Sequence, residues 1–235
     1  MVVLHQFHMS PFNQKLQRML RYKGVEFSEQ YWSLAQQKTL KQHNPVGKLP
    51  AVEHQGQWVC DSTDAAYFLE GLYPEPAMIP ADAAGRAMVH VLEDWADESL
   101  YFYEMHLRFT TEGNWQRNLP RMFEHEGWFL KSLLAGRFPG LIRKGIQKIT
   151  STQGVGRKSQ EQLLRDCRRH LDAVAGLLGE GQWLVGDSLT LADLAVFSMF
   201  QCLKDTRELA QMLDEYPVIG HWMRRVEDLT RSVPG

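Results

Sequence analysis

The sequence predicts an α/β domain followed by an all-α domain, and three observations carry this prediction. Predicted strands alternate with predicted helices over residues 1–76, and the last two strands form a hairpin. A proline-rich break, formed by Pro74, Pro76 and Pro80, follows this segment and is typical of a domain boundary. Residues 82–235 show no convincing strand pattern, and their apolar residues recur at helical spacing. We therefore expect two domains, 1–76 and 82–235.

In the first domain, the order of predicted elements is β-α-β-α-β-β-α. The first strand is β-branched and apolar, and the helix after it begins at Pro11, where the first turn has no use for the missing N–H. Gln55-Gly56 supplies the compact turn of the hairpin. The expected strands are residues 2–7, 25–32, 51–54 and 57–60, and the expected helices are 11–23, 35–42 and one that begins at 61–64. A mixed sheet covered on both faces follows from this order.

In the second domain, helices are expected over 83–109, 119–134, 159–178 and 194–203, and after Pro217. Thr190 and Asp193 have the spacing of a capping box at the start of the fourth helix. Residues 136–158 contain six basic and no acidic residues. This segment is interpreted as a solvated basic loop, or alternatively as the entrance for an anionic second substrate.

The composition is that of a globular protein and excludes several other classes. Of 235 residues, 44% are hydrophobic and 23% are charged, which argues against a disordered or fibrous protein. The net charge of −2 gives no reason to expect a nucleic acid or a membrane as partner, and no apolar run has membrane-spanning length. The three widely spaced cysteines, Cys60, Cys167 and Cys202, suit a reducing cytoplasm and predict neither disulfides nor a metal site.

Ser10 lies where the first strand passes into the first helix. A hydroxyl, free backbone N–H groups and the positive end of the helix dipole meet there, which makes the position an anion site. A thiolate is one anion that such a site holds. Asn13, one turn later, is a second candidate to reach the same anion, and Phe12 lies beside it.

Two further junctions belong to the same domain. In Asn44-Pro45-Val46-Gly47-Lys48-Leu49-Pro50, a cis Pro50 would leave the Leu49 N–H and C=O unpaired and open to an extended peptide. An ordinary trans proline at a strand end is the simpler interpretation. Asp61 and Ser62, at a helix start, are suited to an amino-acid head group, while simple N-capping explains them equally well.

Taken together, these segments resemble the soluble glutathione transferases. The resemblance rests on the element order, on Asn44-Pro45 through Pro50, on Asp61-Ser62, and on Gly186-Asp187 with Thr190 and Asp193. It covers essentially the whole chain. It implies a thioredoxin-like N-terminal domain that binds glutathione and a helical C-terminal domain that binds an electrophile.

The resemblance also implies residue roles. The backbone of Leu49, next to Pro50, would pair with the cysteinyl part of glutathione, Asp61 and Ser62 would hold the γ-glutamyl group, and Lys48 suits the glycyl carboxylate. Ser10 would donate a hydrogen bond to the glutathione sulfur, which favours the thiolate. No cysteine stands at this position, so disulfide exchange through a protein thiol is not expected.

The expected activity is transfer of the glutathione thiolate to small electrophiles, as in cytoplasmic detoxification by a homodimer. Phe102, Tyr103 and His106 lie on the helix that lines the electrophile pocket in this family, although core packing explains them equally well. Two alternatives stay open: a glutathione-binding or scaffold protein without turnover, and a specialised isomerase, dehalogenase or peroxidase that depends on glutathione.

Overall fold

A computed structural model describes residues 1–33, 36–132, 136, 138–179 and 181–231. The chain divides into two compact units. The first contains residues 1–93, 181–198 and 222–235, and the second contains residues 94–180 and 199–221. The first unit combines residues of the expected domain 1–76 with parts of the expected domain 82–235, and the second unit contains residues of 82–235 alone. The boundary expected between residues 76 and 82 stays a prediction.

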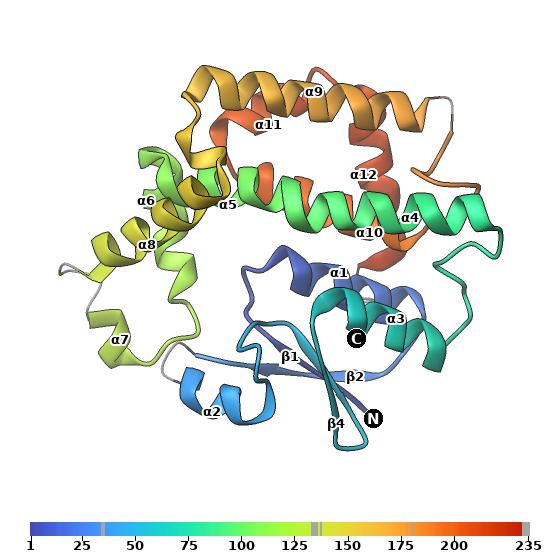
Figure 1. Cartoon of the computed structure of the whole chain (residues 1–235), viewed down its shortest axis with the longest axis horizontal. Coiled ribbons are helices and arrows are strands. Elements are labelled where there is room, and N and C mark those ends of the chain that lie inside the picture. The colour runs from blue at the N-terminus through green and yellow to red at the C-terminus, as the bar shows by residue number, and fades with distance from the viewer. Residues whose placement is uncertain (34–35, 133–135, 137, 180, 232–235) are drawn as a thin grey trace. The chain divides into compact units, whose positions relative to one another are not determined.

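The first unit is built on a four-stranded sheet (Figure 1). Its strands are β1 (Val2–Gln6), β2 (Phe27–Tyr31), β3 (Ala51–His54) and β4 (Gln57–Cys60), in the spatial order β2-β1-β3-β4. β1 pairs with β2 in parallel and with β3 antiparallel, and β3 pairs antiparallel with β4. This mixed sheet agrees with the prediction.

Helices lie on both faces of the sheet, as Figure 1 shows. α1 (Pro11–Tyr22) and α3 (Ser62–Leu72) pack against each other on one face, and α2 (Gln37–His43) lies on the other. The core beneath α1 and α3 consists of side chains with no exposed surface, among them Leu4, Leu16, Met19, Val52 and Leu69. The thioredoxin-like domain expected from the sequence is therefore present.

The rest of this unit includes most of α4 (Ala83–Trp95), the start of α10 (Leu191–Leu203) and the end of α12 (Pro217–Thr230), and a buried carboxylate, Asp193, connects α10 with α12. Asp193 has no exposed surface. It accepts hydrogen bonds from the backbone N–H of Leu184 at 2.9 Å, from both N–H and hydroxyl of Thr190, and from the Trp222 indole at 2.9 Å. The bond from the Thr190 N–H to Asp193 is one of the two bonds of the predicted capping box, and the Thr190 hydroxyl donates to the same carboxylate.

The second unit is helical throughout its described residues. A π-helical turn (Ala96–Leu100) leads into α5, followed by five α-helices and a short 3₁₀ turn. The helices are α5 (Tyr101–Thr110), α6 (Glu112–Met122), α7 (Trp128–Ser132), α8 (Phe138–Gln153), α9 (Gln160–Leu178) and α11 (Arg207–Leu213), and the 3₁₀ turn is Val155–Arg157. Among the described residues, no helix is long and apolar enough to cross a membrane.

Two expectations for the helical region were wrong. The single helix expected over residues 119–134 is instead α6 and α7, separated by a break at residues 123–127; residues 133–134 lie outside the described part. The segment 136–158, interpreted as a basic loop, contains the sixteen-residue helix α8. Its half-buried Ile142 and Ile146 and its buried Thr150 recur every fourth residue, and α8 packs on α5, so tertiary contacts stabilise a helix that Gly140 and Gly145 weaken locally.

Candidate functional site

The strand register brings the predicted glutathione-site segments to one end of the sheet. His5, near the end of β1, pairs with Ala51 at the start of β3, and Ala51 pairs with Cys60 at the end of β4. Ser10 follows β1, Leu49-Pro50 precedes β3, and Asp61-Ser62 follows β4. All three junctions therefore lie at the same end of the sheet, on neighbouring strands.

Ser10 is the N-cap residue of α1, yet its side chain makes no capping hydrogen bond. Its backbone is extended, with φ −77° and ψ 127°, and its own N–H donates to the Phe7 carbonyl at 3.0 Å. No acidic residue occupies the first turn of α1, so the positive end of this helix is not neutralised there. The half-buried hydroxyl thus lies at the positive end of the helix dipole, as an anion site requires.

The loop before β3 is held by a buried asparagine. Asn44 has no exposed surface; its Nδ2 donates to the Lys48 carbonyl at 2.5 Å, and its Oδ1 accepts from the Gly47 N–H at 3.0 Å. Gly47 has φ +67°, in the left-handed region that favours glycine. The sequence motif included Asn44, but its anchoring role was missed; a buried Asn followed by Pro and Gly is the signal that could have found it.

The Leu49–Pro50 peptide bond is cis, as the resemblance implies. Pro50 is buried and Leu49 is half-buried. In the described part of the chain, neither the N–H nor the C=O of Leu49 takes part in a backbone hydrogen bond. These two groups can therefore pair with a peptide laid along the start of β3.

Asp61 caps α3. Its Oδ1 accepts from the backbone N–H of Thr63 at 2.8 Å and more weakly from that of Asp64 at 3.4 Å. The capping role weighed from the sequence is thus present in this structure. Asp61 also has φ +139°, a rare backbone conformation for a residue other than glycine, and such conformations concentrate at binding and active sites. Ser62, beside it, is buried.

The remaining candidates of this unit differ in exposure. Lys48 is exposed, whereas Phe12 is half-buried. Asn13 is 1% exposed, and its Oδ1 has no hydrogen-bond partner in the described structure. A buried amide oxygen without a donor is costly, so Asn13 keeps an unused acceptor one turn after Ser10.

A cluster of aromatic rings on the α2 face was missed from the sequence. His5 stacks on Trp58 with ring centroids 3.9 Å apart, and Trp58 stacks on His43 at 5.0 Å. The Trp32 indole donates to His5 Nδ1 at 3.0 Å, so Nδ1 is the acceptor and Nε2–H donates to Glu53 at 3.0 Å. Burial lowers the pKa of His5, which stays neutral in this arrangement.

These partners come from β2's end, α2, β3 and β4, which local periodicity could not bring together. His5 follows three apolar residues in β1, and a histidine at the end of this apolar strand was the sole signal. The cluster fastens α2 to the sheet beside the Asn44 loop, and it thereby supports the loop that carries Leu49.

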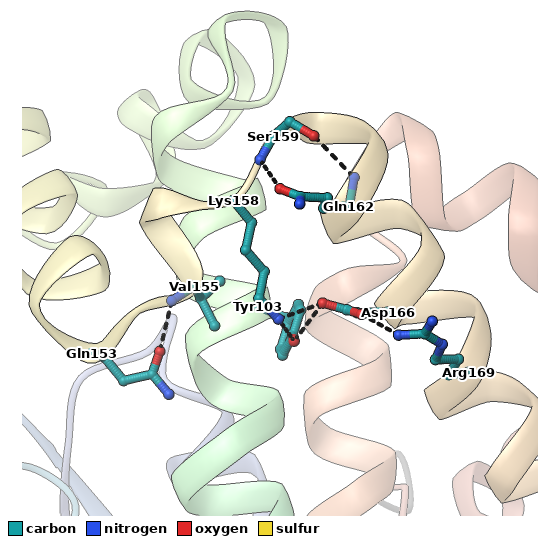
Figure 2. A network of polar contacts seen from close by, with 8 residues as sticks. All are labelled: Tyr103, Gln153, Val155, Lys158, Ser159, Gln162, Asp166 and Arg169. Carbon is teal, nitrogen blue, oxygen red and sulfur yellow. Dashed lines mark hydrogen bonds and ion pairs between the residues drawn. The ribbon is translucent and has the colours of Figure 1, made fainter.

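The three candidates for the electrophile pocket lie in the second unit. Tyr103 is 6% exposed, and its hydroxyl lies 3.1 Å from Asp166 and 3.0 Å from the Lys158 ammonium (Figure 2). His106 Nδ1 lies 3.1 Å from the Thr150 hydroxyl on α8. Phe102 is half-buried. The two polar candidates are therefore engaged in contacts that tie α5 to α8, α9 and the 3₁₀ turn.

Lys158 and Asp166 complete this network (Figure 2). Asp166 accepts from Lys158 at 2.5 Å and pairs with Arg169 at 3.0 Å. Hydrogen bonding to Lys158 lowers the pKa of Asp166, and the same bond raises the pKa of Lys158. Burial raises the pKa of Tyr103, so its phenol stays protonated. Its hydroxyl donates a hydrogen bond to Asp166 and thereby connects α5 with α9.

Comparisons with known proteins agree with this architecture. The family model for the glutathione S-transferase N-terminal domain matches residues 4–77, and the model for the C-terminal domain matches residues 139–229. A glutathione S-transferase structure from Rhodospirillum rubrum F11 is similar in fold, with a TM-score of 0.69, 19% identity, and coverage of 100% of this chain and 94% of that one.

Two curated relatives match over most of the chain. Isoprene-epoxide–glutathione S-transferase of Rhodococcus sp. (strain AD45) is 25% identical over 83% of this chain and 81% of its own length. FtsZ-localized protein A of Caulobacter vibrioides is 27% identical over 82% of this chain and 72% of its own length. Since the two family models together match well over half of the residues, the chain belongs to the glutathione S-transferase family.

Proposed function

We propose that the protein transfers the thiolate of glutathione to small electrophiles, with Ser10 as the donor that stabilises the thiolate. One observation carries the proposal: the Ser10 hydroxyl stands at the N-terminus of α1 and makes no capping bond with it. A hydroxyl in that position has its proton available for an anion that the helix dipole also attracts. Its donated hydrogen bond lowers the pKa of a bound thiol.

The rest of the tripeptide is proposed to bind at the same end of the sheet. The Leu49 backbone groups would form a two-bond ladder with the cysteinyl residue, which positions the sulfur. Ser62, at the start of α3 and its dipole, suits the γ-glutamyl carboxylate, and Asp61 suits the ammonium. Lys48 is proposed for the glycyl carboxylate and, being exposed, would contribute mainly long-range attraction.

The electrophile is proposed to be small and neutral, as an epoxide is. The support is the similarity, over 83% of this chain, to a relative that is named for an isoprene epoxide. Attack by the thiolate forms the C–S bond and opens the ring, and the resulting alkoxide takes up a proton. Phe102, Tyr103 and His106 remain proposed pocket residues, with Phe102 the one whose side chain makes no polar contact of its own. A cytoplasmic homodimer is part of the same proposal.

The test is the Ser10→Ala variant, with Ser28→Ala as a matched control on the exposed side of β2. Loss of a hydrogen bond to a charged group weakens thiolate stabilisation by about 1.5–3 kcal/mol, which corresponds to about 10- to 100-fold in kcat. The ultraviolet absorbance of bound thiolate should titrate at higher pH in Ser10→Ala, while glutathione affinity changes little. Equal turnover in Ser10→Ala and Ser28→Ala would remove Ser10 from this role.

A second candidate function is glutathione binding without turnover. It is favoured by the relative named FtsZ-localized protein A, a name that states a location and no reaction. The two functions separate in one assay series. Binding of glutathione by calorimetry together with no conjugate from epoxide, aryl halide and enone substrates would support the second function, and conjugation of any of them would support the first.

A further inference from the structure

The segment 127–160 concentrates positive charge that the whole-chain composition hides. It contains seven lysine and arginine residues and no aspartate or glutamate, although the chain carries a net charge of −2. Several of these cations have partners: Arg143 pairs with Glu112, and Lys158 pairs with Asp166. Lys144 and Lys148 are exposed and have no ion-pair or hydrogen-bond partner in the described structure. They are available to an outside anion.

These two lysines share one stripe of α8 with exposed aliphatic residues. Leu141, Lys144, Lys148 and Ile149 follow the spacing i, i+3, i+7, i+8, which puts them on one side of the helix. Leu141 is 64% exposed and Ile149 is 51% exposed. The opposite side, with Ile142, Ile146 and Thr150, faces the packed interior, so the outer stripe is not the helix's core face.

A second exposed apolar group lies on α7. Trp128 is 81% exposed and Phe129 is 61% exposed, and their rings form an edge-to-face pair with centroids 6.1 Å apart. Lys131, on the same helix, donates to the Glu124 carbonyl at the end of α6. Near it, Pro120, Arg121 and Phe123 of the same region line a hollow of about 520 Å³. This Trp and Phe thus leave most of their surface outside the packed interior of the unit.

We propose that α7 and the outer stripe of α8 dock on an anionic lipid surface. Trp and Phe prefer the level of the lipid head groups, and Leu and Ile beside lysines enter the same boundary while the ammonium groups meet phosphates. Exposed lysines near an anionic bilayer add electrostatic attraction that falls within a screening length. This mode is peripheral, as fits helices that lie on a membrane without crossing it.

The charge pattern favours lipid over the other occupants. A symmetric contact of α8 with α8 of a second copy would bring Lys144 and Lys148 against their own counterparts, and like charges repel. A nucleic acid backbone would use the lysines and leave Leu141, Ile149 and the aromatic pair in water. The proposal also revises the expectation, based on net charge alone, that no membrane is a partner. It stands independently of the glutathione site.

The experiment is co-sedimentation of the full chain with vesicles of phosphatidylcholine that contain about 30% phosphatidylglycerol, against pure phosphatidylcholine. We expect binding that is at least about tenfold stronger to the anionic vesicles and that is lost at ~1 M salt, where the screening length is about 3 Å. Lys144→Glu/Lys148→Glu should weaken binding about 30-fold or more. Trp128→Ser/Phe129→Ser should weaken it about tenfold or more at low salt.

The matched control is Lys204→Glu/Arg224→Glu, which makes the same change in net charge at exposed cations outside the segment. It should bind the anionic vesicles as the unmodified chain does, and circular dichroism checks that every variant is folded. Equal binding to both vesicle types, or equal weakening by the control, would overturn the proposal. Dimer dissociation by Trp128→Ser/Phe129→Ser without an effect on lipid binding, or tighter binding to an oligonucleotide than to the vesicles, would overturn it in favour of those occupants.

Discussion

The sheet end of the first unit and the segment 127–160 of the second unit differ in the contacts that stabilise them. At the sheet end, single polar side chains each bind several backbone groups: the buried Asn44 fixes the loop before β3, and the exposed Asp61 caps α3. In the helical segment, α8 has one buried polar side chain with a hydrogen bond across to α5, Thr150, and its outer face meets water. In the first region, polar residues close in the sequence determine the local backbone structure. In the second region, the helix α8 depends on its packing against α5.

The largest effect is expected at Asp193 in α10, outside the sheet end, where one buried polar side chain of the same unit likewise binds several groups. In Asp193→Ala, the Leu184 N–H, the Thr190 N–H and the Trp222 indole N–H lose their buried acceptor. Because each unsatisfied buried donor is costly, we expect the free energy of unfolding to fall by about 3–5 kcal/mol. Urea denaturation followed by circular dichroism measures the change.

Asp187→Ala is the matched control, since Asp187 is exposed a few residues away. It should change the free energy of unfolding by no more than about 0.5 kcal/mol. A loss of less than 1 kcal/mol in Asp193→Ala would show that the buried acceptor contributes little, and the contrast between the two regions would lose its physical basis.

The same contrast explains how far sequence reasoning reached. β3 and β4 were predicted with the observed bounds because the hairpin turn Gln55-Gly56 and period-two alternation act over a few residues. α8 was missed because Gly140 and Gly145 argue against a helix. Its packing on α5 cannot be predicted from the sequence of α8 alone. Local sequence patterns therefore predict strands and helices whose patterns are strong. Where the local pattern is weak, as in α8, contacts with distant residues determine the secondary structure.

The candidate site divides in the same way. The three junctions could be placed at one sheet edge from element order, but the partners of His5 could not be found. Trp32 and Glu53 are 27 and 48 residues away along the chain. No periodicity connects such residues before the strand register is known.

The His5 cluster gives a test of intermediate size, through pH. Burial disfavours the charged form of His5, so its pKa in the folded state lies below the ordinary 6.5. Protonation at Nδ1 would in addition place an N–H against the Trp32 indole N–H. A histidine with a lowered folded pKa binds fewer protons when folded. The stability that its neutral form contributes is complete above pH 6.5 and is lost as the pH falls through 6.5 toward the folded pKa.

The measurement is the free energy of unfolding between pH 7 and pH 5 for the unmodified chain and for His5→Phe. The unmodified chain should lose more stability over this range, although His106 and His170, whose pKa values burial also lowers, contribute a background shared by both proteins. Glu53 and His43 are the titratable groups that face the ring, and both remain in His5→Phe. Parallel pH curves for the two proteins would refute the proposed role of the Trp32 bond.

The smallest expected effect, and the one that probes the second region most directly, is a gain in stability from Gly145→Ala. Gly145 lies inside α8 on its exposed face, and a Cβ there meets no atom within 4 Å. Alanine loses less conformational entropy than glycine when the helix forms, so the free energy of unfolding should rise by about 0.5–1 kcal/mol.

Gly47→Ala is the opposing control, because Gly47 has φ +67° and an added Cβ would lie 3.0 Å from the Lys41 side chain. If α8 is held mainly by packing on α5, Gly145→Ala raises stability without altering the Tyr103–Lys158–Asp166 contacts, and thermal unfolding should show a small upward shift against a downward shift for Gly47→Ala. A destabilised Gly145→Ala would mean that residue 145 is not helical, and the stripe of Leu141, Lys144, Lys148 and Ile149 would then not share one face.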